Sequence, residues 1–338
     1  MDIDTDPIPR TPPRPRRIRT AAPLTAVLAA AALAAGPIAA STAAAAPGDG
    51  RTGGGGKPTV VLVHGAFADA SSWDEVVRRL EGEGYDVIAP ANPLRGLTND
   101  STYIASVLRS IKGPIVLAGH SYGGAVISEA AAGNPDVKAL VYVSAFMPDR
   151  GETLAALGAK FPQTRLGDVQ RMVPYRDATG SGVDVYIRDA SFHSVFAADL
   201  PAARARLMAA EQRPIATTAF TQAATGAAWR TVPSWALVAT EDHAINPALE
   251  RYEAERAGSH TVEVGSSHVA MISHPDVVTR LIREAAASAA SPAAATSGAP
   301  ALADTGWRET IVTAIGGIAG AALIMGGVFL ALARKSRG

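Results

Sequence analysis

The chain of 338 residues contains no cysteine. This absence excludes a disulfide framework, a thiolate metal site and a cysteine nucleophile. It does not fix the compartment, because an exported protein need not carry disulfides. The sequence also lacks an H-E-x-x-H motif, a Cys/His cluster and a dinucleotide-binding glycine fingerprint. We therefore expect neither a metal nor a cofactor.

Net charge is absent as well, since 31 Lys and Arg balance 31 Asp and Glu. Residues 1–46 and 306–338 together hold nine of the basic and four of the acidic residues, so the chain between them is mildly acidic. A mildly acidic core gives no reason to expect a nucleic-acid partner.

The first 46 residues have the pattern of an export signal. Five arginines within residues 10–19 precede an apolar run from Ala21 to Ala40, and small residues follow at Ala43–Ala46. This order is typical of a cleaved signal peptide. A retained membrane anchor is the alternative, but the alanine-rich run is only weakly apolar. Arg16-Arg17 suggests twin-arginine export, whereas Arg19 stands where such signals carry a large apolar residue, so we favour the general route.

The C-terminal end combines three features in order. An Ala/Ser/Pro linker at 288–301 leads into the pentapeptide Leu302-Ala303-Asp304-Thr305-Gly306. An uncharged apolar run from Ile311 to Ala333 follows, which is long enough to span a bilayer. The basic residues of Arg334–Arg337 close the chain and are expected to stay cytoplasmic.

Together these features resemble the sorting signal of Gram-positive sortase substrates, in particular the L-A-x-T-G variant of actinobacteria. The resemblance implies cleavage between Thr305 and Gly306 by a sortase and attachment to peptidoglycan at the outer cell surface. A plain single-pass tail anchor in the membrane is the alternative interpretation.

Between these ends, a Gly-rich spacer at 47–57 precedes one block at 58–287, whose length suits a single domain. Short, nearly continuous apolar runs in the block are typical of parallel strands buried on both faces. They lie at Thr59–Val63, Asp86–Ala89, Ile115–Ala118, Ala139–Val143, Trp235–Ala239 and Thr261–Val264. Helical patterns separate them, so we expect a doubly wound, mostly parallel α/β sheet.

The alternation stops between residues 149 and 230, where helix-like stretches such as Pro201–Glu211 follow one another without a strand. We interpret this insertion as a helical lid over the carboxyl edge of the sheet, where such folds bind ligands. Aromatic residues make up only 5% of the chain, which suggests a modest apolar pocket. By position, its candidate lining residues are Phe67, Phe146, Met147, Phe192 and Phe196, although core packing explains these side chains equally well.

The most specific motif is Gly119-His120-Ser121-Tyr122-Gly123. It stands between the predicted strand Ile115–Ala118 and a helical run at Ala125–Ala132, which is the context of a G-x-S-x-G nucleophile elbow. In a Gly-rich protein the motif alone also fits a mere tight turn, but the flanking elements favour Ser121 as a nucleophile.

A serine hydroxyl needs a base, and the base needs an orienting acid, in the chain order Ser, acid, His for this elbow. Of the seven histidines, only His268 follows the final predicted strand, and Asp242 stands at the carboxyl end of the strand before it. We prefer Asp242 to its neighbour Glu241. The other histidines have structural interpretations: His64, His120, His193, His243, His260 and His274.

An oxyanion hole requires two backbone N–H donors. One should be Tyr122, which follows the nucleophile. The other should come from the loop after the first strand, where Ala66 is the better candidate and Phe67 is expected to line the pocket.

Four segments of the core resemble the α/β-hydrolase branch of plant methylesterases and hydroxynitrile lyases. They are Val63-His64-Gly65-Ala66-Phe67 with Trp73 downstream, Gly119-His120-Ser121-Tyr122-Gly123-Gly124, Thr240-Glu241-Asp242 and Ser267-His268-Val269-Ala270-Met271. The resemblance runs over most of 58–287 and is weakest in the lid. It implies an α/β-hydrolase fold. Lyases of the branch carry threonine and lysine where this chain has Gly65 and Val269, so the resemblance favours ester hydrolysis over cyanohydrin cleavage.

The sequence thus predicts an exported serine carboxylesterase that cleaves a small ester through an acyl-enzyme. A cofactor-free haloperoxidase or perhydrolase would use the same triad, and a hydroxynitrile-lyase-like enzyme is a further alternative. A surface binding module that kept the fold without turnover is the alternative from another class. Epoxide hydrolases and dehalogenases of this fold are disfavoured, because their nucleophile is Asp where Ser121 stands.

Overall fold

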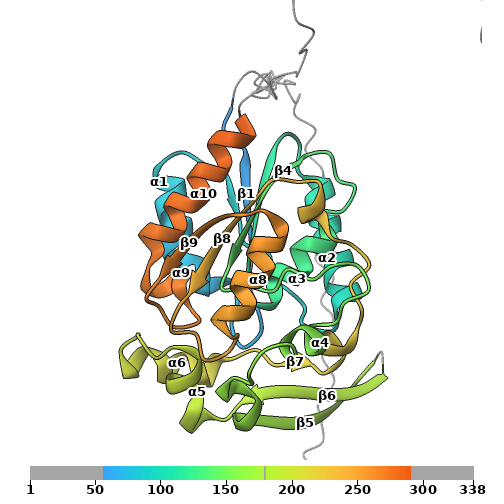
Figure 1. Cartoon of the computed structure of the whole chain (residues 1–338), viewed down its shortest axis with the longest axis vertical. Helices are drawn as coiled ribbons and strands as arrows, with labels where there is room; N and C mark the ends of the chain where they lie inside the picture. The colour runs from blue at the N-terminus through green and yellow to red at the C-terminus, as the bar shows by residue number, and fades with distance from the viewer. Residues whose placement is uncertain (1–55, 179, 291–338) are drawn as a thin grey trace, which may run out of the picture. The chain divides into compact units, whose positions relative to one another are not determined.

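A computed structural model describes residues 56–178 and 180–290 (Figure 1). The predicted signal peptide, most of the spacer, the linker after residue 290 and the sorting signal with Thr305, Gly306 and the apolar run lie outside these residues. Within the two described ranges, no helix is long and apolar enough to cross a membrane.

The core is one sheet of six parallel strands in the order β2-β1-β3-β4-β8-β9. All six predicted strands are present, and the α/β prediction is confirmed. Their bounds are β1 Thr59–Val63, β2 Val87–Ile88, β3 Ile115–His120, β4 Val137–Val143, β8 Ser234–Ala239 and β9 His260–Val264. Every residue of β3 and β8 is buried, as expected for strands covered on both faces.

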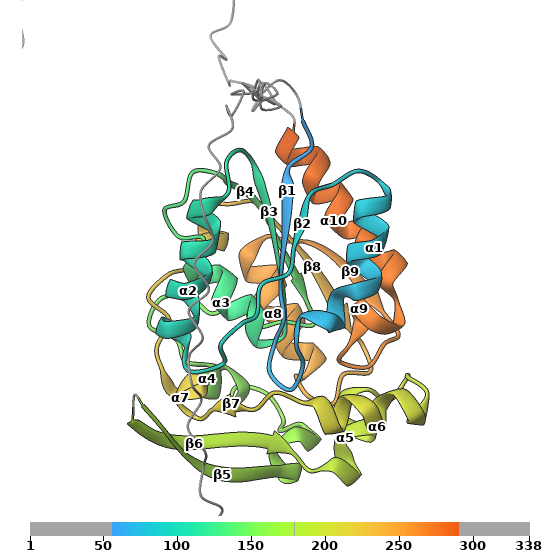
Figure 2. The same cartoon turned by 180° about the vertical axis from the view of Figure 1, so that it is seen from behind.

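Helices cover both faces of the sheet. The long C-terminal helix α10 packs on β3, β4 and β8 beside α1, while α2 and α3 pack against each other on the opposite face and α8 lies on β8 (Figures 1 and 2). Their bounds are α1 Asp74–Gly82, α2 Leu97–Ser110, α3 Tyr122–Ala130, α8 Pro247–Ala257, α9 Ala270–Ser273 and α10 Pro275–Ala290, with short 3-10 turns η1 Ala70–Trp73 and η3 Ala228–Arg230. The helix α10 runs past the predicted domain end at residue 287.

Local signals explain several helix bounds. Asn246 caps α8 by accepting a hydrogen bond from the Ala248 amide at 2.9 Å, and Pro247 occupies the first turn. In α10, Val278, Leu281 and Ile282 are buried along one face, which is the stripe that their spacing predicts.

The segment from 149 to 230 forms a lid beyond the carboxyl ends of the strands (Figures 1 and 2). The prediction that it is helical is wrong in part, because it holds a three-stranded antiparallel sheet in the order β5-β6-β7. Its elements are α4 Leu154–Gly158, η2 Arg165–Val169, β5 Gln170–Asp177, β6 Gly180–Ile187, α5 Asp189–Phe196, α6 Ala202–Glu211, β7 Ile215–Ala216 and α7 Thr218–Thr221. No residue of β5 is buried, so this strand lacks the apolar pattern by which the core strands were found.

Hydrogen bonds tie the lid to the loops of the core. The guanidinium of Arg95 donates to Asp184 on β6 at 2.8 Å, and the amide of Ala216 donates to the carbonyl of Leu94 at 2.9 Å. The lid is therefore fastened to the same edge of the sheet at which the candidate site residues lie.

Candidate active site

A sharp turn at Ser121 separates β3, which ends at His120, from α3, which begins at Tyr122. Ser121 has φ 54° and ψ −124°, a left-handed backbone that a residue with a Cβ adopts only under strain. Glycines allow the turn. A Cβ on Gly119 would lie 2.6 Å from the carbonyl oxygen of Gly123, and one on Gly123 would lie 2.5 Å from that of Val63.

Backbone hydrogen bonds hold the turn against the neighbouring strand. The Ser121 amide donates to the carbonyl of Val143 at 3.2 Å, and the Ser121 carbonyl accepts from the amides of Gly124 at 3.0 Å and Phe146 at 3.2 Å. Only 7% of Ser121 is exposed. The candidate nucleophile is thus fixed in position and almost closed off from solvent.

His268 and Asp242 form a buried pair. The Nδ1 of His268 lies 2.5 Å from Oδ2 of Asp242, while Oδ1 of Asp242 accepts from the amides of Ala244 at 2.6 Å and Ile245 at 3.0 Å. The neighbouring Glu241 is exposed. Because Asp242 accepts at Nδ1, the ring proton is held there and Nε2 is left free to take a proton.

His120, for which the sequence suggested only a structural role, joins Ser121 to the loop that carries His268. Its Nε2 donates to the carbonyl of His268 at 3.0 Å, and the two ring centroids lie 4.7 Å apart. Burial, and then the nearby His268, lower the pKa of His120 well below its usual value. A neutral His120 therefore holds the His268 backbone next to the elbow through this hydrogen bond, without adding a positive charge.

The loop after β1 packs directly on the elbow. A Cβ on Gly65 would lie 2.6 Å from the Cβ of Ser121, so the loop backbone passes as close as it can. The Phe67 amide donates to the carbonyl of Arg213 in the lid at 2.9 Å. Among residues 56–178 and 180–290, the amides of Ala66 and Tyr122 donate to no protein group, which leaves both available to an oxyanion.

His64 braces this loop. Its Nε2 accepts from the Asn92 amide at 2.9 Å, so the proton is on Nδ1, which donates to the carbonyl of Gly65 at 2.9 Å. Desolvation by burial lowers the pKa of His64 from 6.5 to about 4.

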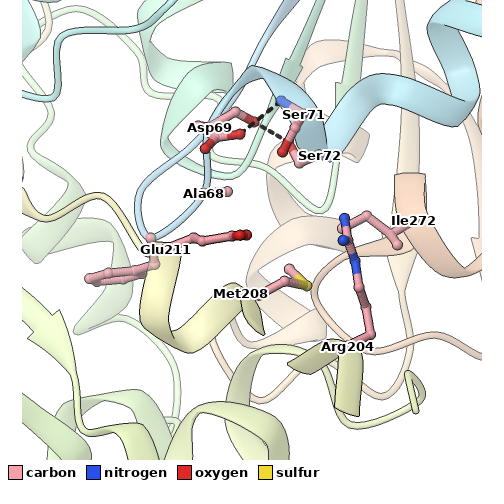
Figure 3. A pocket seen from close by; sticks show the side chains of 9 residues that line it. Ala68, Asp69, Ser71, Ser72, Arg204, Met208, Glu211 and Ile272 are labelled. Atoms are coloured by element: carbon pink, nitrogen blue, oxygen red, sulfur yellow. Dashed lines mark hydrogen bonds between the residues drawn. The ribbon is translucent and has the colours of Figure 1, made fainter. Parts of the chain in front are cut away.

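The two predicted pocket residues, Phe67 and Phe146, each line a pocket of the described structure. Phe67 lines a pocket that also includes Ala68, Met208 and Ile272 (Figure 3), whereas Phe146 lines a different one, beside Ala244 and Ile245. Their shared role in one substrate pocket stays a prediction.

Three phenylalanine rings form a cluster beside His268, and one of them contacts its ring. Phe196 of α5 has its ring centroid 5.0 Å from that of His268 and 6.0 Å from that of Phe67, and Phe192 lies 5.0 Å from Phe196. All three phenylalanines are buried, as is Met147. The cluster packs against His268, which is only 1% exposed.

Asp199, in the lid between α5 and α6, is a site residue that the sequence did not reveal. Its carboxylate accepts from the Ser267 amide at 3.0 Å, from Ser267 Oγ at 2.5 Å and from Ser266 Oγ at 3.1 Å. Burial raises its pKa, but hydrogen bonds from Ser267, Ser273 and Ser266 outweigh burial, and the net pKa is lowered. The lid thus holds the two residues before His268.

The remaining histidines lie in other contacts. His193 of α5 forms a hydrogen bond with the carbonyl of Leu200, and His243 forms one with the carbonyl of Ser194. His260 is the first residue of β9 rather than preceding it, and His274 directly precedes α10. Among the histidines in the part of the chain that the structure describes, only His268 pairs with a carboxylate. In the same part of the chain, no group of three His, Asp or Glu side chains could hold a metal ion.

Comparisons with known proteins identify relatives by sequence and by fold. A sequence profile described as "Alpha/beta hydrolase family" matches residues 60–281. Alpha/beta hydrolase nvfD of Aspergillus novofumigatus (strain IBT 16806) is 27% identical over 256 residues, covering 69% of this chain and 98% of that protein. Methylesterase 8 of Arabidopsis thaliana is 31% identical over 145 residues, covering 39% of this chain and 50% of that protein. The crystal structure of polyneuridine aldehyde esterase superimposes with a TM-score of 0.59 at 22% identity, covering 68% of this chain and 99% of that chain.

Replacing Asp199 by alanine will free the loop that carries His268. We expect kcat on an ester substrate to fall by about tenfold with little change in KM, because a displaced base acts on the transition state rather than on binding. Asp199→Asn keeps one acceptor oxygen and should lose less. Asp189→Asn, which changes an exposed carboxylate in the first turn of α5 in the same lid, is the control. Equal kcat for Asp199→Ala and the control would contradict this role.

The depressed pKa of His64 predicts loss of stability in acid. The unfolded chain binds a proton near pH 6.5 and the native state only near pH 4, so the stability is full above about 6.5 and falls as the pH drops toward 4. The loss should reach about 3 kcal/mol. Urea unfolding of the wild type and His64→Gln across this range measures it. Parallel curves for the two proteins would show that His64 makes no such contribution.

Proposed function

The chain belongs to the alpha/beta hydrolase family, and on that premise we propose that it is a serine carboxylesterase with Ser121 as nucleophile, His268 as base and Asp242 as orienting acid. The observation that carries the proposal is the buried His268–Asp242 pair, joined to the strained elbow by the hydrogen bond from His120 to the His268 carbonyl. A pair of this kind, next to a serine on such a turn, has the parts of a nucleophile, base and acid triad.

In the acylation step, Ser121 Oγ attacks the carbonyl carbon of the ester while Nε2 of His268 takes the hydroxyl proton. Asp242 keeps the other ring proton on Nδ1 and stabilises the imidazolium that forms. The carbonyl oxygen becomes an oxyanion, which the free amides of Ala66 and Tyr122 stabilise. His268 then gives its proton to the leaving alcohol oxygen as the ester C–O bond breaks.

In the deacylation step, water takes the place of the alcohol. His268 Nε2 removes a proton from the water, whose oxygen attacks the acyl carbonyl carbon. Collapse of the second tetrahedral intermediate returns the proton to Ser121 Oγ and releases the carboxylic acid. The same base thus serves both halves of the reaction, and the protein ends as it began.

Two positions support hydrolysis rather than cyanohydrin cleavage. Position 65 has no space for the threonine of the lyases, because a Cβ on Gly65 would lie 2.6 Å from the Cβ of Ser121. Val269 is a buried apolar residue where the lyases have lysine, so no ammonium stands beside the base. A lyase step would lack both side chains on which that branch relies.

The near closure of the site supports a small ester as the substrate. Ser121 is 7% and His268 1% exposed, and the ring of Phe196 stands next to that of His268. A bulky alcohol or acyl group would need the lid to move further than a compact one. We therefore propose a small, largely apolar ester.

Alanine in place of Ser121 will remove the nucleophile. We expect hydrolysis of short-chain p-nitrophenyl esters to fall by at least about 10⁴-fold, and fluorophosphonate labelling, mapped by mass spectrometry, to disappear. The control is Ser144→Ala, just after the adjacent strand β4, whose buried hydroxyl finds no hydrogen-bond partner among the residues that the structure describes. This variant should turn over and label at Ser121 like the wild type.

If the folded wild type neither reacts with the fluorophosphonate nor hydrolyses the esters, Ser121 is not an activated nucleophile. The interpretation as a surface binding module of the same fold would then take its place. Labelling at a serine other than Ser121 would equally contradict the proposal.

We also propose that the protein is exported and joined to the cell wall at the outer surface of a Gram-positive cell. The supporting observations are the N-terminal signal pattern and the pentapeptide, apolar run and basic tail at 302–338. These segments lie outside the described residues.

Cell fractionation tests the anchoring. In a Gram-positive host that carries a matching sortase, the wild type should be released only when peptidoglycan is digested. The variant Thr305→Ala should remain in the membrane fraction, because the bond that the sortase cuts has lost its threonine. Wild type extracted by detergent alone would instead indicate a plain membrane anchor.

A further inference from the structure

Two buried carboxyl groups stand on consecutive turns of α8. Glu250 is 3% exposed and Glu253 is fully buried. An ionised carboxylate inside a protein is costly unless charges or hydrogen-bond donors compensate it. The two residues are otherwise alike, so their surroundings decide which of them can hold a negative charge.

Glu253 has compensating partners. Its Oε1 accepts from the Met147 amide at 2.9 Å and lies 3.6 Å from a guanidinium nitrogen of Arg256. Burial nevertheless raises its pKa to about 8. Glu253 is therefore close to titrating at neutral pH.

Glu250 has less compensation. Its Oε2 accepts from the Ala239 amide at 3.1 Å, and among the described residues its buried Oε1 accepts no hydrogen bond, as is also true of Oε2 of Glu253. Glu253 differs in having the guanidinium of Arg256 beside it. The ionisable groups that face it are the carboxyls of Asp242 and Glu253. Arg251, next to it on the helix, has turned to Glu263, with both nitrogen–oxygen distances below 3 Å.

Asp242 is the opposite case. Its two oxygens accept from the amides of Ala244 and Ile245 and from the ring of His268, so Asp242 has three hydrogen-bond donors where the described residues supply Glu250 with the Ala239 amide alone. The carboxyl of Glu250 lies within side-chain hydrogen-bond reach of Asp242, and two carboxylates so close together inside a protein cannot both ionise. The proton belongs on the member with fewer donors, and burial, followed by the charge of Asp242, raises the pKa of Glu250 well above its usual range.

We propose that Glu250 is a neutral carboxylic acid in the folded enzyme and acts as a positioning residue, donating its O–H hydrogen bond to the carboxylate of Asp242. The proposal rests on the function argued above, in which Asp242 orients the base. The hydrogen bond would hold in place the carboxylate that accepts from Nδ1 of His268. It would also leave one negative charge, rather than two, beneath the imidazole.

Infrared spectroscopy tests the protonation directly. The purified chain with Glu253→Gln, which removes the other buried carboxyl of α8, should show at pH 7 the C=O stretch of a protonated carboxylic acid, above the amide I band. The band should shift in heavy water and disappear when Glu250→Gln is added. A spectrum without this band overturns the proposal, whatever the activity.

Activity and proton NMR test the positioning role. Glu250→Gln keeps a neutral donor, so kcat/KM should stay within about twofold and the low-field Nδ1 proton of His268 should keep its position. Glu250→Ala removes the donor. Its Nδ1 signal should move or broaden, and its kcat should fall by roughly tenfold with KM unchanged. Equal losses in the two variants, or an unchanged signal in Glu250→Ala, would contradict positioning.

The two hypotheses fail separately. A chain that is inactive on esters but shows the Glu250 band loses the esterase proposal and keeps a neutral Glu250. An active chain without the band keeps the esterase proposal and loses this one.

Discussion

At Ser121 a strand turns into a helix so tightly that neighbouring backbones touch. The close approach requires Gly119, Gly123 and Gly65, because a Cβ at any of them would lie within 2.7 Å of a neighbouring atom. The strain of the left-handed serine is sustained by the surrounding strands, whose burial on both faces makes them hard to deform. Everything else in the site is arranged around this turn.

Polar contacts extend from the turn to the lid. His120 bonds the backbone of His268, Asp242 bonds its ring, and Asp199 of the lid bonds the residue before it. In the proposed mechanism the base is thus held from three sides by three elements that are far apart in the sequence. Because the lid helps to hold the base, any movement of the lid over the substrate would also change the position of the base.

The sequence predicted the six core strands and the elbow because buried parallel strands and glycine-flanked turns are local patterns. The lid sheet escaped prediction. No residue of β5 is buried, and Pro174 interrupts it, although the alternation Val183, Val185, Ile187 in β6 was a signal that could have been used. Asp199 and Glu250 could not be found from sequence, since an acidic residue in a loop or helix is usually solvated. Only the fold brings them to Ser267 and Asp242.

The most direct test of the account is the mass of the protein caught during turnover. The chain would be mixed with a p-nitrophenyl ester, quenched in acid within the first turnovers and measured by intact and peptide mass spectrometry. The account predicts a mass increase of one acyl group on the peptide that contains Ser121, together with a burst of p-nitrophenol. Ester hydrolysis with no acyl group on the protein, or with the group on another residue, would contradict it.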